Sequence, residues 1–258
     1  MKTLGKLSQI AILSIATAFV VGCGGGGDSS SNSNTDSNTS NFNTHGVGVI
    51  HNTFTKTPFT YKGTMYIMVK SPTTGRVWLD RNLGASRVCQ TFNDTACYGD
   101  YYQWGRNADG HEDSISSLTF TQATNVTNVG NNLFIKGHLD WAKSGVDKYG
   151  LKRIINNWSK KDGSSICPGG FKAPSRTELS AEFATIHSNI DAFNSFLKIP
   201  ASGYRYYKTG DLGLVGTKGY LWSGQAIGTT DAYFANTNGK IPHAFRGYGM
   251  PVRCIKAQ

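Results

Sequence analysis

One cysteine near the start of the chain has a sequence context that suits covalent attachment of a lipid. Cys23 follows two valines and a glycine, which end an apolar stretch that begins at Ile10, after two lysines. A basic start, an apolar stretch and small residues before a cleavage point are typical of a secretion signal and not of a membrane-spanning helix. A thiol is nucleophilic enough to form a thioether with a lipid. We therefore predict a signal peptide over residues 1–22 and lipidation of Cys23.

The segment Val20–Cys23 resembles the bacterial lipoprotein signal, in which a peptidase cuts before the cysteine and the sulfur carries a diacylglyceryl group with fatty acids such as palmitate. Leucine usually stands where this chain has Val20, and an ordinary signal peptide with a chance cysteine is the alternative interpretation. The resemblance implies a bacterial cell-envelope protein with a stable membrane anchor, because two or more acyl chains hold a bilayer where one is marginal. No aspartate directly follows Cys23, which by resemblance to enteric lipoproteins favours the outer membrane over the inner.

After the cysteine, residues 23–45 are mostly glycine, serine, asparagine and threonine. Such a composition does not bury a core and is typical of a flexible linker. About 22 residues of this kind span roughly 25 Å on average. We therefore expect a tether that holds a folded domain away from the membrane surface.

Four further cysteines remain for the folded part of an exported chain: Cys89, Cys97, Cys167 and Cys254. An even number in an oxidising compartment favours two disulfide bonds, and three connectivities exist. We predict Cys89 with Cys97, which closes a short loop, and Cys167 with Cys254, which ties late elements together. A zinc site is the competing interpretation, but the chain has no CxxC pair and its six histidines stand singly. We predict no metal and no cofactor.

The composition is that of a globular protein with a positive charge. Of 258 residues, 38% are hydrophobic, 16% are charged and 31 are glycine, and the formal net charge is +10. These proportions argue against a coiled coil, a disordered chain and a protein with several membrane spans. A basic exported domain favours acidic or sulfated glycans, or an envelope protein, as partners. Nucleic acid is not expected, because export separates the protein from it.

Hydrophobic patterning predicts several elements in the folded part. Residues 64–70 and 76–80 are rich in strand-forming side chains and flank a turn with proline and glycine, which predicts a hairpin. Residues 147–158 carry apolar side chains at helical spacing, which predicts a helix. Its apolar face consists of Leu151, Ile154, Ile155 and Trp158, with Lys152, Arg153, Asn156 and Asn157 opposite.

Later segments predict a second helical region and a set of strands. Ser175 with Glu178 three residues later is a capping box, and the helix that it starts carries Leu179, Phe183 and Ile186 on one face. Residues 190–197 predict a further short helix. Short strand-like segments then alternate with turns over residues 203–207, 219–223, 231–235 and 251–256. Early strands, central helices and late antiparallel strands predict an α+β domain.

Five motifs of this region, in order, resemble the Fibrobacter succinogenes major paralogous domain. They are WLDRNLGA from Trp78, YGDYYQWGRNADG from Tyr98, CPGGFKAPSRTEL from Cys167, GYLWSG from Gly219 and GMPVRCI from Gly249. The resemblance implies a C-type-lectin-like fold with short antiparallel strands, two or three helices, long loops and stabilising disulfides. It assigns this domain to residues 78–258, with residues 46–77 as strands that lead into it. The family has no established activity.

Several residues of these motifs suit structural roles. Trp78, Trp104 and Trp222 are large apolar side chains with one N–H each, which suits burial against a single partner. Arg81 and Arg106 stand next to Asp80, Asp100 and Asp109, so ion pairs are favoured over a substrate clamp. Gly99, Gly105, Gly110, Gly169, Gly170 and Gly249 suit turns that need positive φ.

The common catalytic signatures are absent, so we predict a non-catalytic protein. The sequence has no GxSxG, HExxH or GxxxxGKS motif. Acidic residues near the aromatic motifs leave a cell-wall or polysaccharide hydrolase with paired carboxylates as the alternative. These acids are Asp80, Asp100, Asp109, Glu112 and Asp113. Asn107, Asp109, Glu112 and Asp113 also offer oxygens for a calcium loop, but such a loop is more often solvated.

The remaining candidates describe a binding surface. Residues 136–161 contain seven lysines and arginines against two aspartates, and residues 232–258 contain four basic residues after Asp231 with no acid. Tyrosines suit stacking on sugar rings. The candidate binding residues are Tyr101, Tyr102, Arg106, Tyr204, Tyr206, Lys152 and Arg153. We expect a lectin-like binding domain that recognises glycans or protein partners at the cell surface.

Overall fold

The computed structural model describes residues 57–258 of the chain. These residues belong to one compact unit. The predicted signal peptide, the lipidated Cys23 and the tether over residues 23–45 lie outside the described residues. Within residues 57–258, no helix combines the length and the apolar character that a membrane span requires.

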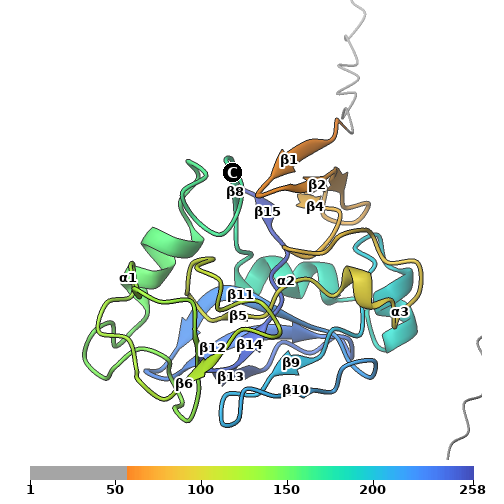
Figure 1. The fold of residues 1–258 in the computed structure, drawn as a ribbon. Coiled ribbons are helices and arrows are strands. Elements are labelled where there is room, and N and C mark those ends of the chain that lie inside the picture. Colours follow the sequence, from red (N-terminus) through yellow and green to blue (C-terminus); the bar gives the residue numbers. More distant parts are fainter. Residues whose placement is uncertain (1–56) are drawn as a thin grey trace, which may run out of the picture. The chain divides into compact units, whose positions relative to one another are not determined.

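The described chain is a mixed, strand-rich structure, which confirms the α+β class (Figure 1). One four-stranded antiparallel sheet joins sequence-distant segments in the order β3-β4-β15-β8. Its strands are β3 (Met68–Lys70), β4 (Val77–Leu79), β15 (Ile255–Lys256) and β8 (Phe171–Lys172). Because β3 pairs with β4, residues before position 78 are an integral part of this sheet.

A second four-stranded sheet has the order β10-β9-β14-β5, and a three-stranded sheet has the order β11-β12-β13. The second sheet contains β5 (Tyr102–Gln103), β9 (Tyr204–Arg205), β10 (Leu212–Gly213) and β14 (Gly249–Met250). The third contains β11 (Tyr220–Ile227), β12 (Asp231–Asn236) and β13 (His243–Phe245). Two further pairs are β1 (Phe59–Tyr61) with β2 (Thr64–Tyr66) and β6 (Leu118–Thr119) with β7 (Phe134–Ile135).

Two local predictions are confirmed. The predicted hairpin is the pair β3 and β4, with Met68 opposite Leu79. The predicted helix start is α2 (Arg176–Phe183), where Ser175 accepts a hydrogen bond from the Glu178 N–H and the Glu178 side chain accepts one from the Ser175 N–H. Helix α2 packs against β11 and β12 (Figure 1). It is followed by α3 (Asn189–Asn194), near the predicted short helix.

The helix predicted over residues 147–158 differs from the structure. Only α1 (Leu151–Arg153) is α-helical, a π-helix follows over Ile154–Trp158, and Gly150 caps the start with a φ of 76°. Leu151 and Ile155, expected on the buried face, are 60% and 61% exposed. The buried side instead carries Arg153, because ion pairs satisfy its charge and the wider π-helical turns change the register.

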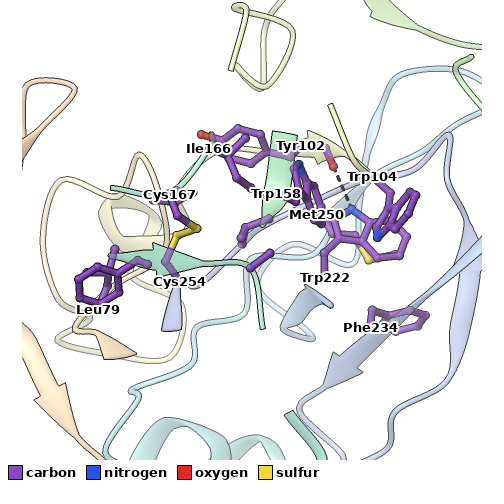
Figure 2. Packing of buried hydrophobic residues seen from close by; sticks show 14 of the residues in the cluster. Leu79, Tyr102, Trp104, Trp158, Ile166, Cys167, Trp222, Phe234, Met250 and Cys254 are labelled. Atoms are coloured by element: carbon purple, nitrogen blue, oxygen red, sulfur yellow. Dashed lines mark hydrogen bonds between the residues drawn. A yellow bond between two sulfur atoms is a disulfide. The ribbon is translucent and has the colours of Figure 1, made fainter. Parts of the chain in front are cut away.

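The hydrophobic cores contain tryptophans whose N–H groups have partners: Trp104 and Trp222 lie in the main cluster, and Trp78 lies in a second cluster. The Trp222 indole N–H donates to the Tyr102 carbonyl at 2.9 Å (Figure 2). The Trp104 indole donates to the Ser223 carbonyl, and the Trp78 indole donates to Glu182. Since Trp78, Trp104 and Trp222 are 0% exposed, their predicted structural role is confirmed.

Both predicted disulfides are confirmed. Cys89 bonds to Cys97, eight residues away, beside the 3-10 helix over Thr95–Cys97. Cys167 bonds to Cys254, 87 residues away, within the main core (Figure 2). Cys254 directly precedes β15 and Cys167 lies shortly before β8, so the bond joins the segments that lead into two paired strands.

Of the six glycines predicted to need positive φ, Gly99, Gly105, Gly110 and Gly170 have it. Gly169 and Gly249 do not, which corrects the prediction for these two. Gly249 is required for another reason, because a Cβ there would lie 2.8 Å from the Tyr101 carbonyl oxygen. The backbones of β14 and β5 therefore approach too closely for a side chain.

Candidate functional site

Four of the seven predicted binding residues are buried in the core. Tyr101 and Tyr102 are 3% exposed, Arg106 is 0% exposed and Arg153 is 1% exposed. The Tyr101 hydroxyl donates to the Ser202 carbonyl at 2.6 Å. Tyr101, Arg106 and Arg153 therefore do not present a surface to a glycan, which corrects that part of the prediction, while Tyr102 lines a small cavity. Lys152 is exposed, and Tyr204 and Tyr206 are half-buried.

The buried arginines are satisfied internally. Arg106 forms an ion pair with Asp109, with Nε 2.8 Å from Oδ2, and it also donates to the carbonyls of Asn131 and Leu133. Arg81 binds Asp80 through two nitrogens. Both arginines thus form the ion pairs that their neighbours predicted, and they hold long loops in place.

The half-buried tyrosines belong to an aromatic cluster on β9 and the residues before β14. The ring centroids of Tyr204 and Tyr206 lie 5.2 Å and 5.5 Å from that of Tyr248. Tyr207 lies 5.0 Å from Tyr248 but is only 7% exposed. Alternate members of this run therefore face inward, as expected for a strand, and the rings pack on one another.

A second cluster combines two arginines, one aspartate and two tryptophans. Arg153 binds Asp140 with Nη1–Oδ1 and Nη2–Oδ2 distances of 2.6 Å and 2.9 Å, and Arg246 Nη1 lies 3.4 Å from Asp140 Oδ2. Both guanidinium groups lie over the Trp104 ring, at 5.4 Å and 5.0 Å from its centroid. Arg153 also lies over the Trp141 ring. The cluster joins segments about 100 residues apart.

This cluster determines which charged side chains of residues 136–161 are exposed to solvent. Both acids of the segment are used inside the protein, because Asp140 and Asp147 each bind Arg153. The exposed charge is therefore lysine alone. The exposed lysines are Lys143, Lys148, Lys152, Lys160 and Lys161. Residues 232–258, the other basic segment, contribute less positive charge to the surface than their sequence suggests, since Arg246 and Arg253 are buried.

A hollow of about 370 Å³ lies beside these lysines. We call it the basic hollow, and its lining includes His138, Asp140, Lys143, Lys148, Thr229 and Thr230. Lys143 and Lys148 come from the loop before α1, while Thr229 and Thr230 come from the turn between β11 and β12. The sequence pattern pointed to the lysines but missed the threonines, because only the tertiary fold brings them together.

The candidate calcium loop is an internal hydrogen-bond network. Asp109, His111 and Glu112 are the one group of described residues whose ligand atoms lie close enough to hold a metal. However, His111 Nε2 accepts a hydrogen bond from the Gln103 N–H at 3.0 Å, so its proton lies on Nδ1. Nδ1 in turn lies 2.7 Å from Asp109 Oδ1. His111 Nδ1, the nitrogen that faces the two carboxylates, therefore carries a proton and has no free lone pair for a metal ion.

The chain has no match in the comparisons with known proteins: no family model, no curated protein and no solved structure matches it.

Proposed function

We propose that this protein is a lipid-anchored binding protein of the bacterial cell envelope, with a C-type-lectin-like domain of the Fibrobacter succinogenes major paralogous type. It stands on the outer membrane through Cys23 and its tether. Its basic hollow binds an acidic or sulfated glycan of the cell surface. The domain acts by recognition and carries out no catalysis.

One observation carries the proposal for the ligand. In residues 136–161 the two aspartates neutralise a buried arginine, which leaves Lys143 and Lys148 without carboxylate partners among the described residues. Thr229 and Thr230 also line the hollow, and the Thr230 hydroxyl donates a hydrogen bond to Asp231. A concave site with ammonium and hydroxyl donors suits the sulfate or carboxylate groups of a polysaccharide.

The two disulfides support a place outside the cytoplasm. Both cysteine pairs are closed, and disulfides persist mainly in oxidising compartments such as the periplasm or the cell surface. This agrees with the secretion signal predicted at the start of the chain. Mass spectrometry of the native protein tests the anchor: we expect a diacylglyceryl thioether on Cys23, and an unmodified thiol there would contradict it.

Binding of the full chain in detergent to a sulfated oligosaccharide, measured by calorimetry, tests the hollow. We expect Lys143→Gln with Lys148→Gln to weaken binding roughly 5- to 20-fold, because two charge-assisted contacts are lost. The matched control is Lys70→Gln with Lys240→Gln, which removes the same charge from exposed positions elsewhere. An equal loss in both double variants would show a general charge effect and would contradict a site at the hollow.

A polysaccharide hydrolase is the second candidate function, and one observation favours it. Burial, with the charge of Glu112, raises the pKa of Asp100 to about 7. Burial also acts on Glu112, but hydrogen bonds from His111 and the Gly110 N–H outweigh it and lower its pKa. Two neighbouring carboxyl groups with separated pKa values are the pattern of an acid and its carboxylate partner. Release of reducing sugar from cell-wall polysaccharide, abolished by Glu112→Gln, is the expected result for a hydrolase.

A further inference from the structure

Three tyrosines and two carboxyl groups line a second cavity, which we call the Asp100 cavity. Its volume is about 190 Å³, and its lining includes Tyr61, Lys62, Tyr66, Asp100, Tyr102 and Glu112. Tyr61, Lys62 and Tyr66 come from the β1–β2 hairpin, and Tyr102 comes from β5. Asp100 lies two residues before β5, and Glu112 lies in a later loop. Pockets for drug-sized molecules measure about 300–1,000 Å³, so this cavity suits a single small ring.

The tyrosine hydroxyls are positioned by the protein itself. The Tyr61 hydroxyl donates to the Ser165 carbonyl at 2.8 Å, and the Tyr66 hydroxyl accepts a hydrogen bond from the Gly84 N–H at 3.0 Å. Their rings are thereby fixed as walls of the cavity. Walls of this kind offer apolar faces to a ligand, together with a few well-placed polar groups.

The Asp100 carboxyl group has few partners within the described part of the chain. Its one hydrogen bond among residues 57–258 comes from the Tyr102 hydroxyl, at a long 3.4 Å, and it forms no ion pair there. Asp100 is half-buried, and partial burial of a carboxyl group with one long hydrogen bond is unfavourable, so such a group in a cavity points to a function. The backbone also packs tightly on it, because a Cβ on Gly84 would lie 2.1 Å from Asp100 Oδ2.

The other groups around the cavity offer complementary hydrogen bonds. Glu112 Oε2 is held by the Gly110 N–H at 2.8 Å, so Glu112 stays ionised and its other oxygen is an acceptor. Lys62 supplies donors at the rim. A protonated carboxyl group, a carboxylate and an ammonium group around aromatic walls suit a ligand with several hydroxyl groups, each of which both donates and accepts.

We propose that the Asp100 cavity binds one ring of a neutral sugar, with the Asp100 carboxyl group donating a hydrogen bond to a sugar hydroxyl. This site is lined by none of the residues of the basic hollow and does not depend on the function proposed there. The donor exists only while Asp100 is protonated. The charged or titratable groups that act on it are Glu112, Asp113, Lys62, Tyr66 and Tyr102.

Ligand-observed saturation-transfer NMR on the full chain in detergent tests the proposal, with a panel of methyl glycosides of neutral hexoses as the probe. We expect binding of at least one member at pH 6. Because the protonated fraction of Asp100 falls above pH 7, we expect the affinity to drop about 30-fold between pH 6 and pH 8.5. Asp100→Asn keeps a donor but does not titrate, so its binding is expected to stay constant over this range.

Three controls separate the outcomes. The exposed Asp162→Asn leaves the pH dependence unchanged. Lys143→Gln with Lys148→Gln leaves methyl glycoside binding unchanged, so failure of the basic hollow is distinguished from failure of this site. Formation of free hexose during the measurement would support both this site and the hydrolase. No binding by any methyl glycoside at pH 6, or the same pH dependence in Asp100→Asn and the wild type, would overturn the proposal.

Discussion

Arg153 and Asp140 form a two-point ion pair, with N–O distances of 2.6 Å and 2.9 Å, and the arginine side chain is almost completely shielded from water. The aspartate is shared with Arg246, which comes from the other end of the chain. Because each charge is buried with a partner, the pair depends on both members being present. It anchors the loop that carries Lys143 and Lys148 against the tryptophan core.

The first prediction concerns this pair. Asp140→Asn removes a charge that two buried arginines share, so we expect the free energy of unfolding to fall by about 3–5 kcal/mol. Urea denaturation followed by tryptophan fluorescence measures it. Arg87→Met is the control, because the Arg87 side chain is 52% exposed in its ion pair with Asp94, and only a small loss is expected from a solvent-screened pair. Equal losses in both variants would contradict the anchoring role.

The second prediction concerns the pH dependence of stability. Burial, aided by Glu112, raises the pKa of Asp100 from 3.8 to about 7, so between these values the folded state holds a proton that the unfolded state has released. Its contribution to stability therefore decreases as the pH rises from about 4 to about 7, by up to about 4 kcal/mol. We expect Asp100→Asn to gain stability relative to the wild type over this interval. A stability difference that is flat from pH 4 to pH 8 would count against it.

The third prediction compares the two disulfides. The Cys167–Cys254 bond closes a much longer loop, with a sequence separation of 87 against 8 for Cys89–Cys97. Loop entropy predicts losses of about 4–5 kcal/mol and about 2–3 kcal/mol when each pair is replaced by serine. Thermal unfolding of the two double variants measures the order. A larger loss from the short loop would show that packing, and not chain entropy, dominates.

The fourth prediction concerns the start of α2. Ser175→Ala removes the hydrogen bond to the Glu178 N–H at 3.2 Å, and we expect a loss of about 1 kcal/mol in the free energy of unfolding. Ser175→Asn retains a capping oxygen and is expected to lose little. If alanine and asparagine behave alike in urea denaturation, the cap does not stabilise the helix.

Local elements were predictable because their signals lie in a few neighbouring residues. The capping box at Ser175 and the hairpin around its Pro-Gly turn follow from short-range hydrogen bonds and steric preferences. The disulfide pairing followed from an even cysteine count together with spacing. The helix over residues 147–158 was mispredicted because a hydrophobic pattern treats arginine as a polar, exposed residue. Arg153 is buried here, because two acids from outside its helix form ion pairs with it.

The candidate binding surface also combines features that the sequence predicts with features that only the tertiary structure decides. The sequence alone determined that the chain is basic, and its hydrophobic patterning predicted the α+β class. The tertiary structure decided which charges reach the solvent, since Arg106, Arg153, Arg246 and Arg253 are all buried, and the partners of each include residues outside its own segment. It also placed the Asp100 carboxyl in a cavity. Burial and desolvation depend on contacts between distant segments, and no local pattern of residue types encodes them.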